Sequence, residues 1–415
     1  MNDRPVQLIV SGDLQRSRAT VFFRLILVIP LVVWLALWGL AATIAVIVNW
    51  FATLIQGQSP QSLHDFIAAY VRFAIHLYAY LLLAAEPYPD FLGKPGYPVD
   101  VRIAPPAPQN RWKVGFRIVL AIPALLIAGA LTSGRASGYG YNYGLGLAGV
   151  AAMLGWFVGV AQARMPRGLR DLVAYGLSYA AQFDAYVFLL TDRYPDSDPQ
   201  TAIGELPVRS DPIGLEVGGE LARNRLTVFF RLILAIPHLI WLALWAIAAL
   251  IAVVANWFVT LAGGISPASL HNFLAAYVRY QQHVYAYLFL IADPFPGFTG
   301  KVGSYPIEPR IAPPATQNRW TVGFRIVLAI PAVLINSAYG GLLLVVAVLG
   351  WFAALATGGM PLGMRNAGAL AIRYAAQANG YYLLLTDAYP YSGPVATAGN
   401  EPSAAVPEPF AEPVL

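Results

Sequence analysis

Residues 25–55 read LILVIPLVVWLALWGLAATIAVIVNWFATLI and contain no charged side chain over 31 positions. A helix needs about 20 apolar residues to cross the hydrocarbon core of a bilayer, so this stretch is long enough to span one. Residues 232–262 repeat the pattern, with His238 as the only ionisable group. The two stretches predict an integral membrane protein rather than a soluble protein with buried core helices.

The composition of the whole chain agrees with this prediction. Hydrophobic residues make up 58% of the 415 residues and charged residues only 11%, against about 25% charged in soluble proteins. The chain has no cysteine, which excludes disulfides and thiolate metal sites. The net charge of +5 does not point to nucleic acid, because the basic residues largely flank apolar segments, as the positive-inside rule expects.

The chain contains a tandem duplication. TVFFRLILVIPLVVWLALWG at 20–39 returns as TVFFRLILAIPHLIWLALWA at 227–246, an offset of 207. RIAPPAPQNRWKVGFRIVLAIPA at 102–124 returns at 310–332 with two changes. Self-similarity at a fixed period is the signature of a repeat architecture.

Each half divides again into two related units. Every unit carries an FR-x-x-L-x-IP core, then a Trp-Phe pair, then a closing acid before a Tyr-Pro or Phe-Pro. The second unit has an insertion rich in Gly, Tyr and Ser around 132–144. We place the four units at 1–93, 94–200, 201–300 and 301–391, and expect the Pro/Ala/Glu-rich tail at 392–415 to be disordered.

The motifs resemble those of the bacterial membrane-protein family filed as domain of unknown function 4389. The carrying residues are FFRLILAIPHLI (229–240), NWF (256–258) and AYLFLIADPFP (286–296). The resemblance implies four tandem copies of a helical membrane fold. It implies no activity, because none is assigned to that family.

The number of membrane crossings depends on the first apolar stretch of each unit. If it is one Pro-kinked helix, we expect an all-α bundle of about eight transmembrane helices; if it is a hairpin, the number is twelve. The N-terminal segment and every inter-unit linker carry three or four basic residues, which favours one shared cytoplasmic side and eight crossings. The turn at Arg164–Arg170 carries three basic residues and departs from this pattern.

Short extended pieces occur in the linkers. They lie at Val6–Val10, Val99–Ile103, Gly214–Val217 and Ile307–Ile311. If all linkers share the cytoplasmic face, these pieces are able to pair into one small sheet that ties the four units together.

The second apolar segment of each unit predicts a stripe of polar side chains. Residues four apart share a helix face, and Arg72 falls near the bilayer midplane if its helix stands upright. A midplane arginine costs about 2.5–3.5 kcal/mol and needs a partner, for which we considered Asn49 or Asn256, tyrosine hydroxyls and Asp184. The stripe is either a polar site between repeats, a set of structural locks, or the polar face of an interfacial helix. Its candidate residues are Arg72, His76, Tyr80, Arg279, His283, Tyr287, Arg373 and Gln377.

The arginine of each FR-x-x-L-x-IP core sits where a helix leaves the interface. We interpret these residues as interfacial anchors, bound to lipid phosphate or to the closing acid of a neighbouring unit. The proline that follows is expected to kink the helix. The four anchors are Arg24, Arg117, Arg231 and Arg325.

No catalytic motif is present in the sequence, and the five histidines are too scattered for a metal cluster. We therefore expect no enzyme activity, metal or cofactor. The leading expectation is a non-catalytic, multi-pass protein of the bacterial inner membrane. It would act as a scaffold or accessory subunit that packs with the lipid bilayer or other membrane proteins. The alternative is a transporter or channel with a polar site between repeats.

Overall fold

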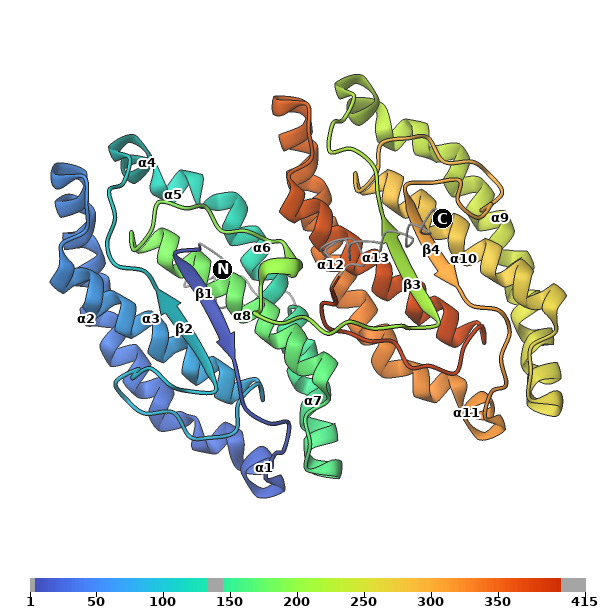
Figure 1. Ribbon diagram of the computed structural model, residues 1–415, viewed down its shortest axis with the longest axis horizontal. Coiled ribbons are helices and arrows are strands. Elements are labelled where there is room, and N and C mark those ends of the chain that lie inside the picture. Colours follow the sequence, from blue (N-terminus) through green and yellow to red (C-terminus); the bar gives the residue numbers. More distant parts are fainter. Residues whose placement is uncertain (1–3, 133–144, 397–415) are drawn as a thin grey trace, which may run out of the picture.

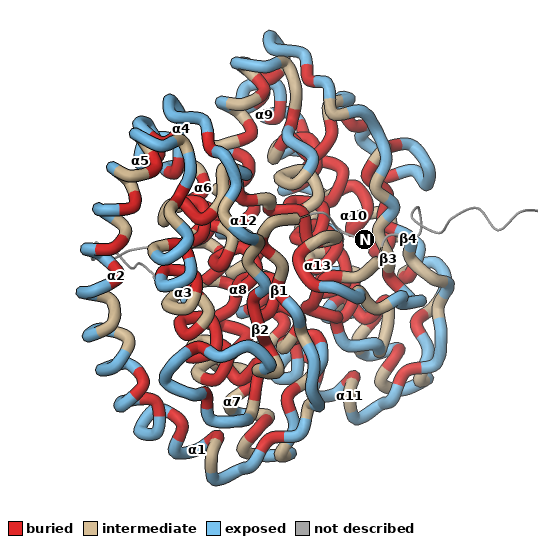
Figure 2. The backbone as a smooth tube through the Cα atoms, turned by 60° about the vertical axis from the view of Figure 1, so that its left-hand side comes forward, coloured by how far each residue is buried: buried red, intermediate tan, exposed pale blue. Residues whose placement is uncertain are grey.

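The computed structural model describes residues 4–132 and 145–396, and these residues form three stacked layers. Figure 1 looks onto a layer of short strands, with helices behind it. The strands pack on a middle layer of buried helices, and those pack on an outer layer of long apolar helices (Figure 2). The two halves of the duplication lie side by side within the layers.

The outer layer contains the first apolar stretch of each unit. In the first unit it forms α1 (Arg18–Leu27) and α2 (Ile29–Gln56), and in the third it forms α9 (Arg225–Gly263). The fourth unit has α11 (Arg319–Gly323) and α12 (Arg325–Thr357). We call these the long helices. The corresponding elements of the second unit are α4 (Arg111–Gly115), α5 (Arg117–Leu120), α6 (Ile122–Thr132) and α7 (Leu147–Gln162).

The hairpin alternative is wrong for the first, third and fourth units, because no turn divides their apolar stretches. The helix continues without a break through Pro237 and Pro331, and in the first unit it is interrupted only at Val28, before Pro30. In the second unit, residues 133–144 of the expected insertion lie outside the described residues.

Three helices among the described residues are long and apolar enough to cross a membrane. They are Arg18–Gln56, Arg225–Gly263 and Arg325–Thr357. The second apolar segments are not among them, so the expected bundle of about eight transmembrane helices is not confirmed. The protein is a mostly helical chain with a few membrane-length helices and two small sheets.

The middle layer consists of the second apolar segments, which we call return helices. They are α3 (Gln61–Leu81), α8 (Arg167–Val187), α10 (Ala268–Leu288) and α13 (Leu362–Tyr382). Each ends two residues before a leucine held in the left-handed backbone region, at φ values of 63° to 65°. That leucine's carbonyl accepts a hydrogen bond from the side chain eight residues before the unit's core arginine. The four pairs are Arg16–Leu83, Gln109–Leu189, Arg223–Leu290 and Gln317–Leu384.

The strand layer contains two separate sheets, so the prediction of one four-stranded sheet is wrong. β1 (Val6–Val10) pairs antiparallel with β2 (Val99–Ile103), and β3 (Ile213–Val217) pairs with β4 (Ile307–Ile311). In each half, the strand at the start of one unit pairs with the strand at the start of the other unit. Because β1 and β2 rest on α8 and α3 while β3 and β4 rest on α13 and α10, the two sheets stay apart (Figure 1).

The two units of each half pack reciprocally. The indole N–H of Trp50, near the end of α2, donates to the carbonyl of Val114 at the start of the second unit, at 2.9 Å. Trp156, near the end of α7, donates to Val21 at the start of the first unit, at 3.0 Å. The second half repeats both bonds, so the two outer-layer segments of each half run antiparallel about an approximate twofold axis. The repeated pairs are Trp257–Val322 and Trp351–Val228.

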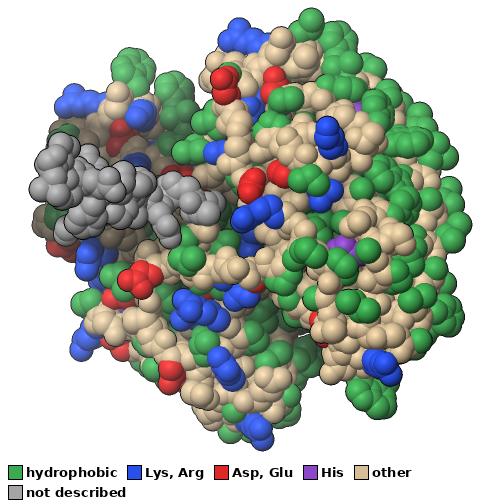
Figure 3. All heavy atoms as spheres, turned by 45° about the vertical axis from the view of Figure 1, so that its right-hand side comes forward, with side chains coloured by type: hydrophobic (Ala, Val, Ile, Leu, Met, Phe, Trp, Pro, Cys, Tyr) green, Lys and Arg blue, Asp and Glu red, His purple; other side chains and the backbone are tan. Residues whose placement is uncertain are grey.

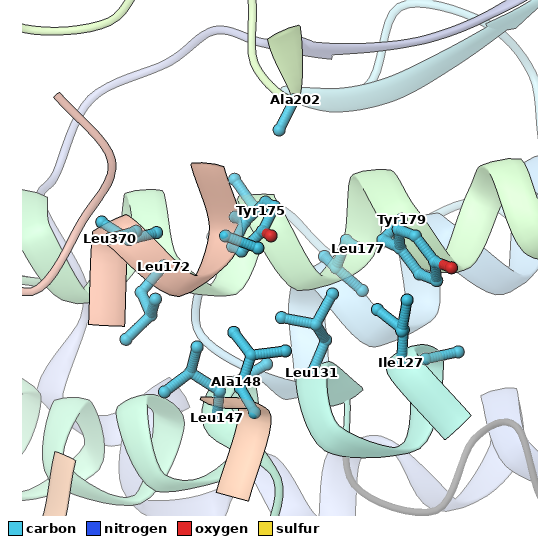
Figure 4. Close-up of a cluster of buried hydrophobic side chains, with 14 of the residues drawn as sticks. Ile127, Leu131, Leu147, Ala148, Leu172, Tyr175, Leu177, Tyr179, Ala202 and Leu370 are labelled. Atoms are coloured by element: carbon cyan, nitrogen blue, oxygen red, sulfur yellow. The ribbon is translucent and has the colours of Figure 1, made fainter. Parts of the chain in front are cut away.

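The halves meet through one continuous core. Leu370 of α13 lies in the same buried cluster as Leu172 of α8 and Leu147 of α7 (Figure 4). Ser392, at the start of the expected tail, is buried, and its carbonyl accepts a hydrogen bond from Tyr339. Residues 397–415 of that tail lie outside the described residues.

Two glycines in the loop before β4 provide a test of backbone packing. Both have positive φ, +57° at Gly300 and +69° at Gly303. A Cβ at Gly300 would lie 2.3 Å from the carbonyl oxygen of Ala276, whereas one at Gly303 would meet nothing within 4 Å. We expect Gly303→Ala to lower the free energy of unfolding by about 1 kcal/mol, and Gly300→Ala by more than about 2 kcal/mol.

Chemical denaturation in detergent micelles, followed by tryptophan fluorescence, measures both losses. Equal losses for the two variants would show that the close approach of Gly300 to α10 does not constrain the fold.

Candidate functional site

The predicted polar stripe of the first unit faces the strand layer. His76 Nε2 lies 2.9 Å from Asp100 Oδ1 in β2, and Arg72 Nε lies 3.6 Å from the same carboxylate. Arg72 also donates to the carbonyl of Val101 at 3.1 Å. The ring of Tyr97 packs beside the His76 ring, with centroids 4.7 Å apart. These contacts fasten the linker strand onto α3.

The third unit repeats this arrangement with a longer acid. Glu308 in β4 lies 3.0 Å from His283 Nε2 and 2.9 Å from Arg279 Nε. Tyr305 packs beside His283, with centroids 4.9 Å apart. All three polar side chains are buried, so the carboxylate and the guanidinium compensate each other away from water.

The carboxylates of the two halves differ in their electrostatics. Burial acts to raise the pKa of Asp100, but hydrogen bonds from His76 and from the amides of Gly96 and Val101 outweigh it and lower that pKa. For Glu308 burial dominates, and its pKa is raised despite the neighbouring Arg279. The carboxylate at this position therefore stays ionised to a lower pH in the first half than in the second.

The fourth unit uses the stripe in the same way, but its acid is Asp211, which lies just before β3 and accepts a hydrogen bond from Gln377 at 3.3 Å. Arg373 donates to the carbonyls of Tyr391 and Gly393, which follow the closing motif. Gln377 donates to Ile213 O at 2.9 Å and accepts from the Tyr391 amide at 3.1 Å. The stripe residues hold extended chain segments against the return helices in this unit too.

The stripes do not combine into one site. Arg72 and His76 lie in the first half and Arg279 and His283 in the second, on α3 and α10, which occupy opposite sides of the molecule (Figure 1). The expected partners of Arg72 and Arg279 were also wrong, because the observed ones are the strand acids Asp100 and Glu308 and carbonyls of the linkers. Asn49 instead donates to Phe188 O and accepts from Ser59.

The sequence analysis missed Asp100 and Glu308 as partners. The available signal was an acid in the second position of a short extended piece, VDVRI at 99–103 and IEPRI at 307–311. The acid recurs in both halves, at the offset of 208 shown by the surrounding repeat.

The core arginines form a second recurring cluster. Arg24 donates to the carbonyls of Tyr80 and Ala85 and to Glu86 at 2.7 Å, and its guanidinium lies 4.3 Å from the centre of the Tyr80 ring. The other units reproduce this contact with their own tyrosine and closing acid. The equivalent sets are Arg117 with Tyr186 and Asp192, Arg231 with Tyr287 and Asp293, and Arg325 with Tyr381 and Asp387.

These clusters correct two expectations. Each core arginine binds the closing acid of its own unit, not that of a neighbour, and its side chain is buried rather than open to lipid phosphate. Tyr80 and Tyr287, predicted as part of the polar stripe, belong to the arginine clusters instead. The clusters join the start of each long helix to the end of its return helix.

The fold and these contacts define a repeat protein whose unit is a long apolar helix fastened to a buried return helix. The model of the family described as Domain of unknown function (DUF4389) matches residues 18–93, 225–299 and 319–392, more than half of the chain. The chain belongs to this family. Of the four copies expected, the matches cover the first, third and fourth units. No curated protein and no solved structure matches the chain.

Loss of the buried carboxylate at Glu308 tests the strand attachment. We expect Glu308→Gln to lower the free energy of unfolding by about 3 kcal/mol, because it leaves Arg279 buried without a counter-charge. Glu216→Gln is the matched control, since its ion pair with Arg310 is exposed, with side chains 60% and 63% accessible, and contributes about 0–1 kcal/mol. Denaturation in detergent measures both, and similar losses would contradict a structural role for the buried pair.

A conservative change tests the core arginines. Arg231→Lys replaces a planar group that reaches two carbonyls, Asp293 and a tyrosine face with a single ammonium. We expect the free energy of unfolding to fall by about 2 kcal/mol. The exposed first-turn residue Arg225 is the control, and Arg225→Lys should change stability by less than about 0.5 kcal/mol. A neutral Arg231→Lys would refute the importance of the multiple contacts.

Proposed function

We propose that the protein is a non-catalytic membrane component that acts as a scaffold or accessory subunit, packing with lipid or with other membrane proteins. One contrast carries the proposal. The buried polar side chains of the predicted stripe are bound to the protein's own strands and linkers, while the apolar side chains of the long helices point outward. Leu25, Leu40 and Ile55 on α1–α2 are 70%, 69% and 71% exposed. An apolar surface of this extent is typical of proteins that bind a membrane or a partner.

The cellular setting is part of the same proposal. Basic residues in the N-terminal segment and linkers favour a cytoplasmic location for these segments at a bacterial inner membrane. A multi-pass arrangement with eight crossings would require the return helices to cross as well as the long helices. Return helices lie between the other two layers and are largely buried, with His76 and His283 only 1% and 0% exposed.

A transporter would need its buried polar groups to line a shared path. The internal repeats and the buried arginines Arg72 and Arg279 are the features that support this alternative. Their contacts with Asp100 and Glu308 in separate halves favour the scaffold instead.

Photo-crosslinking combined with a flux assay tests the proposal. A photoreactive residue replacing Leu40 should crosslink to lipid or to another membrane protein. One replacing Leu31 on the same helix, which is 0% exposed, should crosslink only within the chain. Purified protein in liposomes should conduct no ion flux above that of empty liposomes.

Flux that disappears in the Arg72→Gln and Arg279→Gln double variant, with its fold retained, would overturn the scaffold and favour transport. Crosslinking from Leu40 only within the chain would remove the basis for an outward packing surface.

A further inference from the structure

We propose that the protein lies flat in one leaflet of a lipid bilayer, with its long-helix layer among the acyl chains and its strand layer in water. The proposal concerns how the chain sits in the membrane. It rests on membrane association and not on the scaffold role.

The symmetry of each half places all outer-layer helices on one side. The reciprocal bonds Trp50–Val114 and Trp156–Val21 relate the two units by an approximate twofold axis. The same twofold rotation exchanges β1 with β2. Its axis is therefore perpendicular to the layers and passes through both the strand layer and the long helices. Rotation about this axis turns a unit within the layer but does not turn it over. Both units of a half therefore present their outer-layer helices to the same face, and α12 of the second half packs beside α6 and α7 of the first half, which continues the layer across the two halves.

The linkers exclude an upright orientation of the long helices. The linker of the first half begins beside the start of α1, where Arg16 binds the carbonyls of Leu83 and Ala84. It ends beside the end of α2, where the amide of Gln109 donates to Gly57 O at 2.8 Å. The second half repeats the pattern from Arg223–Ile291 to Gln317–Gly264. Each linker therefore runs the full length of a long helix.

If the long helices stood upright, the linkers would have to cross the hydrocarbon core. They contain exposed charges, among them Lys94, Arg102 and Arg310, whose side chain is 63% accessible. Their two-stranded sheets also have open edges, and open sheet edges and irregular loops do not face lipid. With the helices lying flat, the same segments all face water.

The length of the apolar layer agrees with a flat orientation. Residues 25–55 are uncharged and extend about 46 Å along a helix axis at 1.5 Å per residue, against about 30 Å of hydrocarbon. Even at a tilt of about 40° they would cover roughly 35 Å of depth. Lying flat, their length is not limited by the thickness of the membrane.

The residues at the edge of the outer layer are of the types that favour the headgroup region of a bilayer. Each unit's first helix begins with an exposed arginine, and Trp112 and Trp320 beside two of them are 78% and 77% exposed. Tryptophan and arginine favour the depth of the lipid headgroups. Figure 3 shows mainly hydrophobic side chains along its right-hand edge, with a basic side chain at the lower end. The four arginines are Arg18, Arg111, Arg225 and Arg319.

Depth-dependent fluorescence quenching tests the proposal on the full chain. The chain has no native cysteine, so single cysteines at Leu25, Leu40 and Ile55 can each carry an environment-sensitive fluorophore. The protein is placed in vesicles of phosphatidylcholine and phosphatidylglycerol that contain lipids spin-labelled at different acyl depths. We expect the three positions to report the same depth, within one leaflet. The equivalent positions Leu232, Ile247 and Ala262 on α9 should give the same flat profile.

A profile in which Leu40 is deepest and Leu25 and Ile55 are shallow would overturn the proposal in favour of membrane crossing. Absence of quenching at all three positions, with the protein bound to vesicles, would overturn it in favour of a layer covered by protein.

Side-specific labelling provides the second measurement. Asp13 and Gln58 are exposed at opposite ends of the first long helix, and Glu220 and Ile265 are the equivalent positions in the second half. Cysteines at all four should react with a membrane-impermeant maleimide from the same side of sealed vesicles. Reaction of Asp13→Cys and Gln58→Cys from opposite sides would refute the flat orientation even if one variant of the quenching series failed to fold.

Discussion

A buried guanidinium at the start of each unit is the constraint on which the rest of the structure depends. Removing an arginine from water costs several kcal/mol unless its donors and its charge are compensated. Arg24 meets this requirement with two carbonyls at the end of α3, the Glu86 carboxylate and the Tyr80 ring. These acceptors come from one short segment, so the arginine fixes where the return helix ends against the long helix. The packing of the long helix against its own return helix is thereby fixed by contacts within one unit.

The units then pack together because the end of one unit's outer-layer helix is complementary to the start of its neighbour's. A tryptophan near the end of one long helix finds a carbonyl near the start of its neighbour, and the neighbour returns the same bond. This antiparallel arrangement forces the linker between units to run the length of the long helix. Once the linker lies along the return helix, its strand can pair with the strand before the first unit. Arg72 and His76 can then bind its acid.

Much of this organisation could be predicted from the sequence, and the limit has a physical cause. The repeated FR-x-x-L-x-IP core marked the long helices and the short extended pieces marked the strands, because both patterns are local. The partner of Arg72 was not predictable in the same way, since Asp100 reaches it only because the linker runs back along the return helix. The same course of the linker divides the strands into two sheets instead of one. Arg24 and Glu86 were both recognised, but pairing within a unit or between units depends on a return helix whose end the sequence does not mark.

The reciprocal tryptophan bonds have a consequence for synthesis. In the first half they join Trp50 to Val114 and Trp156 to Val21, so both close within the N-terminal part of the chain. The sheet of that half is complete once Ile103 has been made. Domains generally fold as units from the N-terminus during translation, and this half can assemble while the second is still being translated. The nascent second half then meets a finished surface of α6, α7 and α8 on which to build its own core.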